Sequence, residues 1–181
     1  MEPNLLIPSL LLGIVLLWLV ITYNSLVNRR NQVRYAFACT DVQLKKRYDL
    51  VPNLVETVKG YAAHEKQVLE GVTRARAEVA AKGAGWHAQE HLHQQLGQLI
   101  ARAEAYSELK SDRNFVMLQR QLAECEAQIA AARRAYNASI MDYHNSIEMI
   151  PSSLVAGVFG FRHLPAFEIA VAERANPTVK F

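Results

Sequence analysis

The sequence predicts an all-α protein in which an N-terminal transmembrane helix continues into an antiparallel bundle of long helices. Three observations predict this fold class: an uncharged apolar run near the N-terminus, apolar residues that recur every three or four positions over most of the remaining chain, and few helix-breaking residues between these segments. No stretch shows the two-residue alternation of a half-buried strand. At 181 residues the chain has the length of one domain.

The apolar run covers residues 5–23, LLIPSLLLGIVLLWLVITY, and follows a short tail at 1–4. A helix of about 20 apolar residues matches the hydrocarbon thickness of a bilayer, so the run is interpreted as a transmembrane anchor. A cleaved signal peptide would carry a basic region before a shorter apolar run, whereas Glu2 comes before this one. A buried helix of a soluble protein would show one polar face, which the run lacks.

The residues that flank the run indicate its orientation. Arginines follow the run closely and none precedes it, so the positive-inside rule places the N-terminus outside and the rest of the chain in the cytoplasm. Aromatic residues near its inner end suit the interfacial belt, and the arginines suit anionic lipid headgroups. The residues expected at the membrane interface are Trp18, Tyr23, Arg29, Arg30 and Arg34.

Residues 24–150 are expected to form the cytoplasmic helical bundle. The clearest periodicity begins at Phe115 and ends at Ile150, with apolar residues spaced by threes and fours as in a coiled coil. The glycines of KGAG, the polar KSDR and Pro151 mark the ends of segments. The expected helices are 24–49, 52–82, 86–109 and 113–149.

The boundary at Pro52 lies within the stretch YDLVPNLVETV, which otherwise has a helical pattern. Proline is favoured in the first turn of a helix, and it disfavours helical geometry in the residue before it. Asp49 is available to cap the following helix. We therefore expect a helix corner at Leu50 and Val51, with a structural role rather than that of a functional hinge.

The last bundle helix carries polar residues within its apolar face. Tyr136, Asn137, Ile140, Tyr143 and Ile147 form an expected interaction seam with other helices. Buried asparagines that pair across helices fix register and partner choice, while a capping or surface position is the alternative.

The C-terminal segment 151–181 is apolar and is expected to make a packing or assembly contact. Its aromatic residues Phe159, Phe161 and Phe167 must be covered. Folding back onto the bundle is the first expectation, and contact with a neighbouring copy or the membrane surface is the alternative.

Two long stretches carry a family resemblance. YNSLVNRRNQVRYAFACTDVQLKKRYDLVPNLVETVKGYAAHE and NFVMLQRQLAECEAQIAAARRAYNASIMDYHNSIEMIPSSLVAGVFGF resemble the LemA family of bacterial membrane-anchored helical proteins. Phe37 stands where that family usually carries tryptophan, so the position is still aromatic in this chain. The resemblance implies a single-pass anchor in the bacterial inner membrane and a cytoplasmic antiparallel helical bundle. It also implies a link to membrane metalloproteases and envelope stress, and it supplies no catalytic residue set.

The stretch WHAQEHLH contains a candidate metal site. His87, Glu90 and His91 match the pattern of an inverted zinc-protease motif, with two imidazoles one helical turn apart. A zinc site also needs a third protein ligand, and His93 lies off that face of the helix. A solvated helix face is therefore the main interpretation. No catalytic residues, metal or cofactor are expected.

Other candidate sites have structural interpretations. Cys39 and Cys125 are expected to be buried free thiols on the reducing side of the membrane. The basic clusters at 45–47 and 133–134 lack the interleaved aromatic residues of a nucleic-acid surface. The chain is thus expected to bind no nucleic acid.

Two functions remain. The first is a non-catalytic membrane scaffold that assembles with copies of itself and organises or shapes the bilayer, with lipid and further copies of the chain as partners. The alternative is an adaptor or regulator of a membrane metalloprotease or another envelope-stress enzyme. Helical faces that exceed what one chain can bury favour the first.

Overall fold

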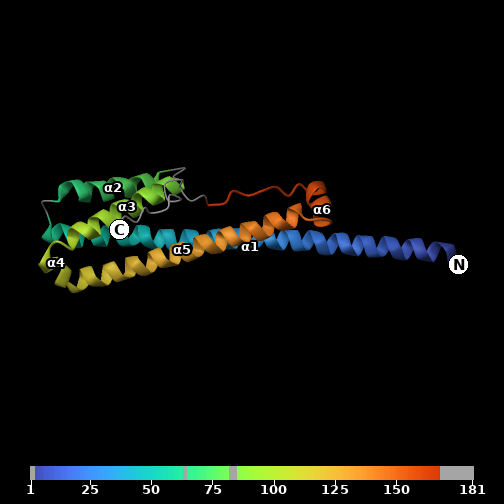
Figure 1. The fold of residues 1–181 in the computed structure, drawn as a ribbon, viewed down its shortest axis with the longest axis horizontal. Coiled ribbons are helices and arrows are strands. Elements are labelled where there is room, and N and C mark those ends of the chain that lie inside the picture. The colour runs from blue at the N-terminus through green and yellow to red at the C-terminus, as the bar shows by residue number, and fades with distance from the viewer. Residues whose placement is uncertain (1–2, 63–64, 82–84, 168–181) are drawn as a thin grey trace, which may run out of the picture. The chain divides into compact units, whose positions relative to one another are not determined.

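The computed structural model describes residues 3–62, 65–81 and 85–167, with side chains from Ile7 onward (Figure 1). The described chain contains helices and no strand, which confirms the predicted all-α class. The helices are α1 (Pro3–Tyr61), α2 (Lys66–Ala80), α3 (Trp86–Ala103), α4 (Ser107–Ser111), α5 (Arg113–Glu148) and α6 (Ser152–Val158).

The chain divides into two compact units. Unit 1 consists of Met1–Thr40 and Ala132–Phe181, and unit 2 consists of Asp41–Ala131. The two longest helices, α1 and α5, each contribute residues to both units. Each unit has its own apolar core, so the two are described separately.

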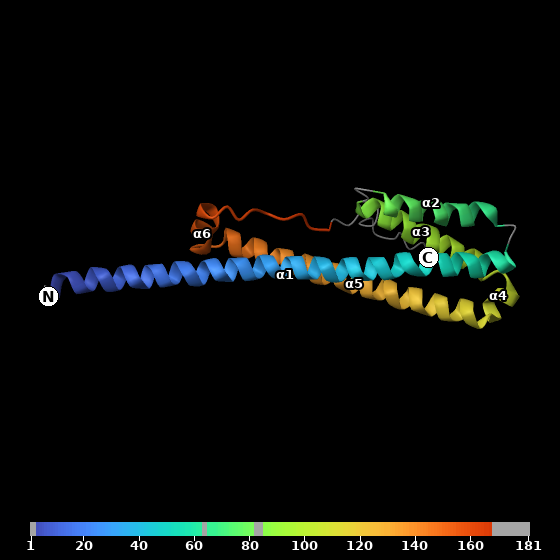
Figure 2. The ribbon, with the colours of Figure 1, turned by 180° about the vertical axis from the view of Figure 1, so that it is seen from behind.

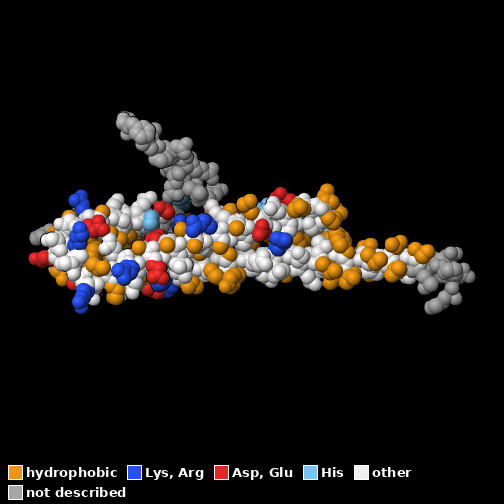
Figure 3. Space-filling model, turned by 60° about the horizontal axis from the view of Figure 1, so that its bottom comes forward, with side chains coloured by type: hydrophobic (Ala, Val, Ile, Leu, Met, Phe, Trp, Pro, Cys, Tyr) orange, Lys and Arg blue, Asp and Glu red, His pale blue; other side chains and the backbone are white. Residues whose placement is uncertain are grey.

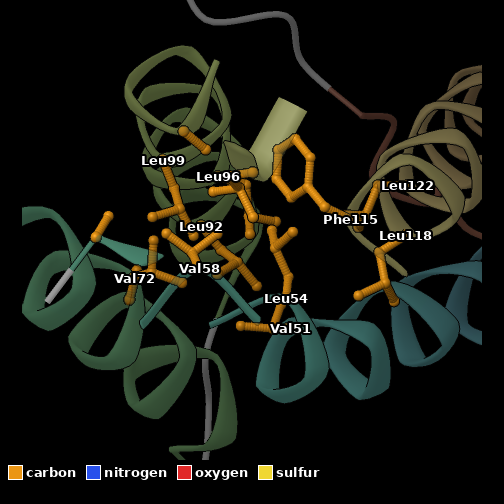
Figure 4. Packing of buried hydrophobic residues seen from close by; sticks show 14 residues of the cluster. Val51, Leu54, Val58, Val72, Leu92, Leu96, Leu99, Phe115, Leu118 and Leu122 are labelled. Carbon is orange, nitrogen blue, oxygen red and sulfur yellow. The ribbon is translucent and has the colours of Figure 1, made fainter. Parts of the chain in front are cut away.

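Unit 2 is a helical bundle around a continuous core. In Figures 1 and 2, α2 and α3 lie along the C-terminal part of α1. Apolar side chains from α1, α2, α3, α4 and the first part of α5 meet between the helices (Figure 4). The buried core residues include Val51, Leu54, Val58, Val72, Leu92, Leu96, Leu99, Leu109, Phe115, Leu118 and Leu122. These are the apolar stripes of amphipathic helices, which none of the helices could bury alone.

The helix corner predicted at Pro52 is wrong, because α1 continues without interruption to Tyr61. Proline has no backbone N–H, so within a helix it leaves the carbonyl four residues earlier without its usual partner. Here that carbonyl belongs to Tyr48, and it accepts a hydrogen bond from Nε of Arg76 at 3.4 Å. The guanidinium of Arg76 also lies 4.1 Å from the centre of the Tyr48 ring. A side chain from α2 thus compensates for the proline.

The residue expected to cap a helix at the corner has another role. Asp49 forms an ion pair with Lys45 one turn earlier on the exposed surface of α1. An ion pair between residues four apart stabilises the helix that carries both of them. Asp49 therefore lies inside α1 and does not cap a new helix.

The remaining helix boundaries differ from the expected ones in the middle of the chain. The expected helix 52–82 is divided, because α1 ends at Tyr61 and α2 begins at Lys66. The expected helix 86–109 is also divided, into α3 and α4. The start of α5 is capped by Asp112, whose Oδ1 accepts the N–H of Phe115 at 2.9 Å. This hydrogen bond is the main reason that the pKa of Asp112 lies below its usual range.

Unit 1 packs the first part of α1 against the second part of α5. Its buried residues are Leu26, Val33, Tyr136, Ile140, Tyr143, Ile147, Val155 and Ala156. After α6 the chain turns at Gly160, which has a φ of 70° that favours glycine, and runs back as an extended segment. We call residues 161–167 the strap.

Candidate functional site

The first part of α1 is the candidate membrane anchor. It contains a window long and apolar enough to cross a membrane, and only 6% of that window is buried. A core helix of a soluble protein would be mostly buried, so this low burial argues against that interpretation. Hydrophobic side chains cover this part of α1 in Figure 3. The coarse prediction of an apolar N-terminal helix that fits a membrane protein is confirmed.

Two of the residues expected at the membrane interface, Tyr23 and Arg30, contact the C-terminal segment of unit 1. Tyr23 packs its ring against those of Phe159 and Phe161, with centroid separations of 4.8 and 5.8 Å. The guanidinium of Arg30 lies 5.2 Å from the centre of the Phe161 ring. The structure therefore brings this end of the apolar run together with the C-terminal segment, a contact that sequence reasoning did not predict.

The other expected interface residues do not join this contact. Trp18 is more than a third exposed on the anchor. Arg29 is half-buried, and Arg34 is exposed on α1 beyond the apolar run.

The strap is held to α5 by two pairs of polar side chains. Asn137 bonds the strap at both backbone groups of Phe167: its Nδ2 donates to the carbonyl at 3.2 Å, and its Oδ1 accepts the N–H at 3.0 Å. Tyr136 donates its hydroxyl to the carbonyl of Pro165 at 2.8 Å. Burial raises the pKa of the Tyr136 hydroxyl, so it remains a donor.

The second pair lies two helical turns further along α5. Tyr143 donates its hydroxyl to the carbonyl of Arg162 at 3.0 Å, and the N–H of Leu164 donates to Nε2 of His144 at 3.0 Å. Seven residues of helix span about 10 Å, and three residues of extended chain span about 9 Å. The distance between the two pairs along α5 therefore nearly equals the distance between the strap residues that they bond.

The strap also places apolar side chains against the core of unit 1. Phe161, Leu164 and Phe167 are half-buried there, and the ring of Phe167 lies 4.2 Å from that of Tyr136. A spacing of three residues is typical of an extended chain with polyproline-like geometry, and Pro165 fits it. This spacing is the signal in the sequence that could have revealed the strap.

The predicted seam and assembly residues can now be placed. Tyr136, Ile140, Tyr143 and Ile147 are buried within unit 1. The expectation that Asn137 pairs with another asparagine across helices is wrong, because both ends of its amide bond the strap. Phe161 and Phe167 fold back on their own unit, whereas Phe159 is 57% exposed despite its contact with Tyr23.

Unit 2 contains a polar network around one buried arginine that the sequence did not reveal. The side chain of Arg47 on α1 is 1% exposed. It donates to Oε1 of Glu126 at 3.0 Å and to the side-chain and backbone oxygens of Gln89 at 2.7 and 3.0 Å. Nδ1 of His93 lies 3.1 Å from the other carboxylate oxygen of Glu126. The network thus joins α1, α3 and α5.

The charges in this network shift the pKa values of its members. The hydrogen bond to Glu126 raises the pKa of His93 and outweighs the effect of partial burial. Burial alone would raise the pKa of Glu126, but the hydrogen bonds and charges of His93 and Arg47 bring it below its usual range. The network therefore favours charged His93 beside ionised Glu126.

The two histidines of the candidate metal pair have different surroundings. His87 is exposed, and Nδ1 of His91 lies 2.7 Å from Oε2 of Glu78 on α2. Among the described residues, no group of three or more potential ligands lies together. Cys39 and Cys125 are both free thiols, half-buried and buried respectively. Burial raises the pKa of the Cys125 thiol.

The chain is similar to known proteins over most of its length. The model of the LemA family matches residues 36–181. Curated relatives include magnetosome proteins MamQ 2 and MamQ 1 of Paramagnetospirillum magneticum, each 25% identical over 83% of this chain and 66% of the relative. Magnetosome protein MamQ of Magnetospirillum gryphiswaldense is 24% identical over 82% of this chain and 65% of its own length. The chain thus spans slightly less than two thirds of these relatives.

Proposed function

The chain belongs to the LemA family, and from that premise we propose that it is a non-catalytic, membrane-anchored helical scaffold. In this proposal it assembles with copies of itself at the bacterial inner membrane and organises or shapes the bilayer. The apolar first part of α1 is the anchor, and the basic residues after it face the cytoplasm.

Exposed apolar side chains of unit 1 beyond the anchor carry the proposal of self-assembly. Tyr35 on α1 is 74% exposed and Met141 on α5 is 65% exposed. Exposed residues of these types are enriched where proteins contact one another. In unit 1 the two long helices bury their facing sides and the strap covers α5, which leaves these side chains available to a second copy.

The polar clusters support a role without catalysis. Two histidines of the stretch WHAQEHLH contact carboxylates of other helices: His91 lies beside Glu78 and His93 beside Glu126. Arg47 bonds groups on two further helices. These contacts link helices within unit 2. They give His91, His93 and Arg47 a structural role that requires no catalytic reaction.

Photo-crosslinking in bacterial cells tests self-assembly. Benzoylphenylalanine replaces Tyr35 or Met141 in the full chain, and Asp142, exposed on a different side of α5, serves as the matched control position. We expect irradiation to give a product of twice the chain mass from positions 35 and 141, and much less from 142.

Two other outcomes would contradict the scaffold. A product joined mainly to a protein of another mass would support the alternative, an adaptor of a membrane metalloprotease or other envelope-stress enzyme. A monomeric particle mass in nanodiscs, for the full chain and for a shortened chain that begins at Asn24, would remove self-assembly altogether.

A further inference from the structure

The turn and short helix between α5 and the strap expose apolar side chains to an unusual degree. From Met149 to Phe161 the sequence MIPSSLVAGVFGF contains no charged residue. Ile150 is 84% exposed, Leu154 68% and Val158 81%. Leu154 and Val158 are spaced by four within α6 and so lie on one face of that helix, and Ile150 is exposed in the turn before it.

The opposite face of α6 is already used. Val155 and Ala156 are buried in the core of unit 1. The outward apolar side chains therefore take no part in the core of unit 1, and nothing in the described part of the chain covers them.

The position of α6 within unit 1 suggests what covers this face. Leu19, inside the apolar run of α1, packs against the same cluster as Val155 and Ala156. Phe159, directly after α6, contacts Tyr23 at the end of that run. In Figures 1 and 2, α6 runs across the direction of α1, beside the helix rather than along it.

We propose that the outward apolar surface formed by Leu154 and Val158 of α6, with Ile150 before the helix and Phe159 after it, inserts into the interfacial layer of the bilayer that α1 crosses. The proposal rests on the proposed membrane anchor and adds a second point of lipid contact to it. An apolar helical face that lies in the membrane plane is stabilised where headgroups meet acyl chains.

Continuity with the anchor favours lipid over a second copy of the chain as the occupant. If residues 5–23 span the hydrocarbon, Leu19 and Tyr23 lie at its inner boundary, and α6 shares their cluster. Charged residues appear only on either side of the uncharged stretch, at Glu148 and Arg162. This distribution leaves the apolar face for lipid and the charges for water or headgroups.

Insertion on one side of the bilayer would also give the scaffold a means of shaping the membrane. The anchor crosses both leaflets, whereas α6 would add area only to the leaflet at the inner end of the anchor. Amphipathic helices that insert in this way are sensitive to bilayer curvature.

Spin-label accessibility in the full chain tests the proposal. The native Cys39 and Cys125 are replaced by alanine, and a nitroxide is attached to a cysteine at Leu154, Val158 or the control position Asp142. The protein is placed in vesicles of phosphatidylcholine and phosphatidylglycerol. Oxygen concentrates in the hydrocarbon and a water-soluble nickel complex is excluded from it, so we expect a higher ratio of oxygen to nickel collisions at 154 and 158 than at 142.

Either of two results would overturn the proposal. Nickel access at 154 and 158 equal to that at 142 would mean that the face lies in water. Protection from both reagents would mean that protein covers it, as in contact with a second copy. A monomeric chain with the expected ratio would support α6 insertion while contradicting self-assembly, so the two proposals fail separately.

A double variant checks that the apolar face causes the insertion. With a label at Ile150, we expect Leu154→Ser combined with Val158→Ser to lower the ratio of oxygen to nickel collisions toward its value at Asp142. Both residues are exposed, so we expect the variant to stay folded. Circular dichroism verifies this. An unchanged ratio would show that the apolar side chains are not what holds α6 in the bilayer.

Discussion

Units 1 and 2 use α1 and α5 in different ways. In unit 2, apolar stripes from α1, α2, α3 and α5 enclose a core, and a separate polar network joins α1, α3 and α5. In unit 1, the same two long helices pack with α6 and the strap, and polar side chains of α5 bond the backbone of the strap. One unit is closed by side chains of regular helices, and the other by an extended segment without regular structure.

This difference predicts how each unit responds to damage. A helical bundle unfolds cooperatively, because each stripe is buried by several others. A strap bonded at a few backbone groups can open locally while the helices beneath it remain folded. We therefore expect changes in unit 2 to alter global stability and changes at the strap to alter local opening.

The largest effect is expected at Arg47. Replacing this buried arginine with alanine leaves Glu126 and Gln89 without its hydrogen bonds and creates a cavity. Breaking a buried ion pair by removing one partner costs about 3–5 kcal/mol in the free energy of unfolding. Glu126 is 29% exposed and keeps His93 beside it, so we expect a loss near the lower end of that range. Denaturant titration followed by circular dichroism in detergent measures the loss.

The neighbouring Lys46 provides the control, because it is exposed on the same helix. Lys46→Ala should change the free energy of unfolding by no more than about 0.5 kcal/mol. Equal, small effects of the two substitutions would mean that the Arg47 network does not stabilise unit 2.

A smaller and more local effect is expected at Asn137. Asn137→Ala removes both hydrogen bonds to the backbone of Phe167. Each such bond contributes about 1 kcal/mol, so the free energy of opening the strap should fall by about 1–2 kcal/mol. Hydrogen exchange should accelerate at Leu164 and Phe167 and stay unchanged in the core of unit 2.

Asn145→Ala is the matched control, since this asparagine is exposed on α5 eight residues further along. It should leave exchange at the strap as it is. If Asn137→Ala instead destabilised the whole chain, the strap and the helices would form one cooperative unit, and the proposed contrast between the units would be wrong.

The same contrast explains how much the sequence could predict. Helical periodicity depends on neighbours in sequence, so the stripe of α5 could be read directly, and the helix runs Arg113–Glu148 where 113–149 was expected. The polar residues within the seam, at Tyr136, Asn137 and Tyr143, are also visible in the sequence. Their partner could not be inferred, because the hydrogen bonds go to backbone groups that carry no residue-specific signal.

Pro52 and Arg47 illustrate a second limit. A proline in a helical pattern most often marks a boundary, and only the approach of Arg76 from α2 shows why α1 continues through it. The burial of Arg47 likewise depends on the simultaneous positions of Gln89 and Glu126 on other helices. Both features result from tertiary contacts that local pattern does not contain.

Pro52→Ala tests whether α1 continues through this position without help from the proline. Alanine restores a backbone N–H that can bond the carbonyl of Tyr48 in place of the long bond from Arg76. Because the helix already continues through Pro52, the restored hydrogen bond should raise the free energy of unfolding of unit 2 by about 1 kcal/mol, as judged by thermal melts. A loss of stability or of helix content would mean that the proline itself maintains the geometry of α1.

The smallest expected effect is the pH dependence of unit 2. The folded pKa of His93 is raised, so its contribution to stability is complete below its ordinary value of about 6.5 and is lost as pH rises through the folded value. The folded pKa of Glu126 is lowered, so its contribution is present above about 4.3 and is lost as pH falls through the folded value.

Stability of unit 2 should therefore be greatest in the mildly acidic range between these two transitions. Arg47 remains charged throughout and continues to hold Glu126, so the loss above the His93 transition should be partial. Denaturant titrations at several pH values, followed by the fluorescence of Trp86 in a Trp18→Phe chain, report unit 2 alone. His93→Gln should abolish the alkaline decline while His87→Gln preserves it, because His87 is exposed on α3 whereas His93 pairs with Glu126. A decline that survives in His93→Gln would assign the titration to another group and remove the network as its cause.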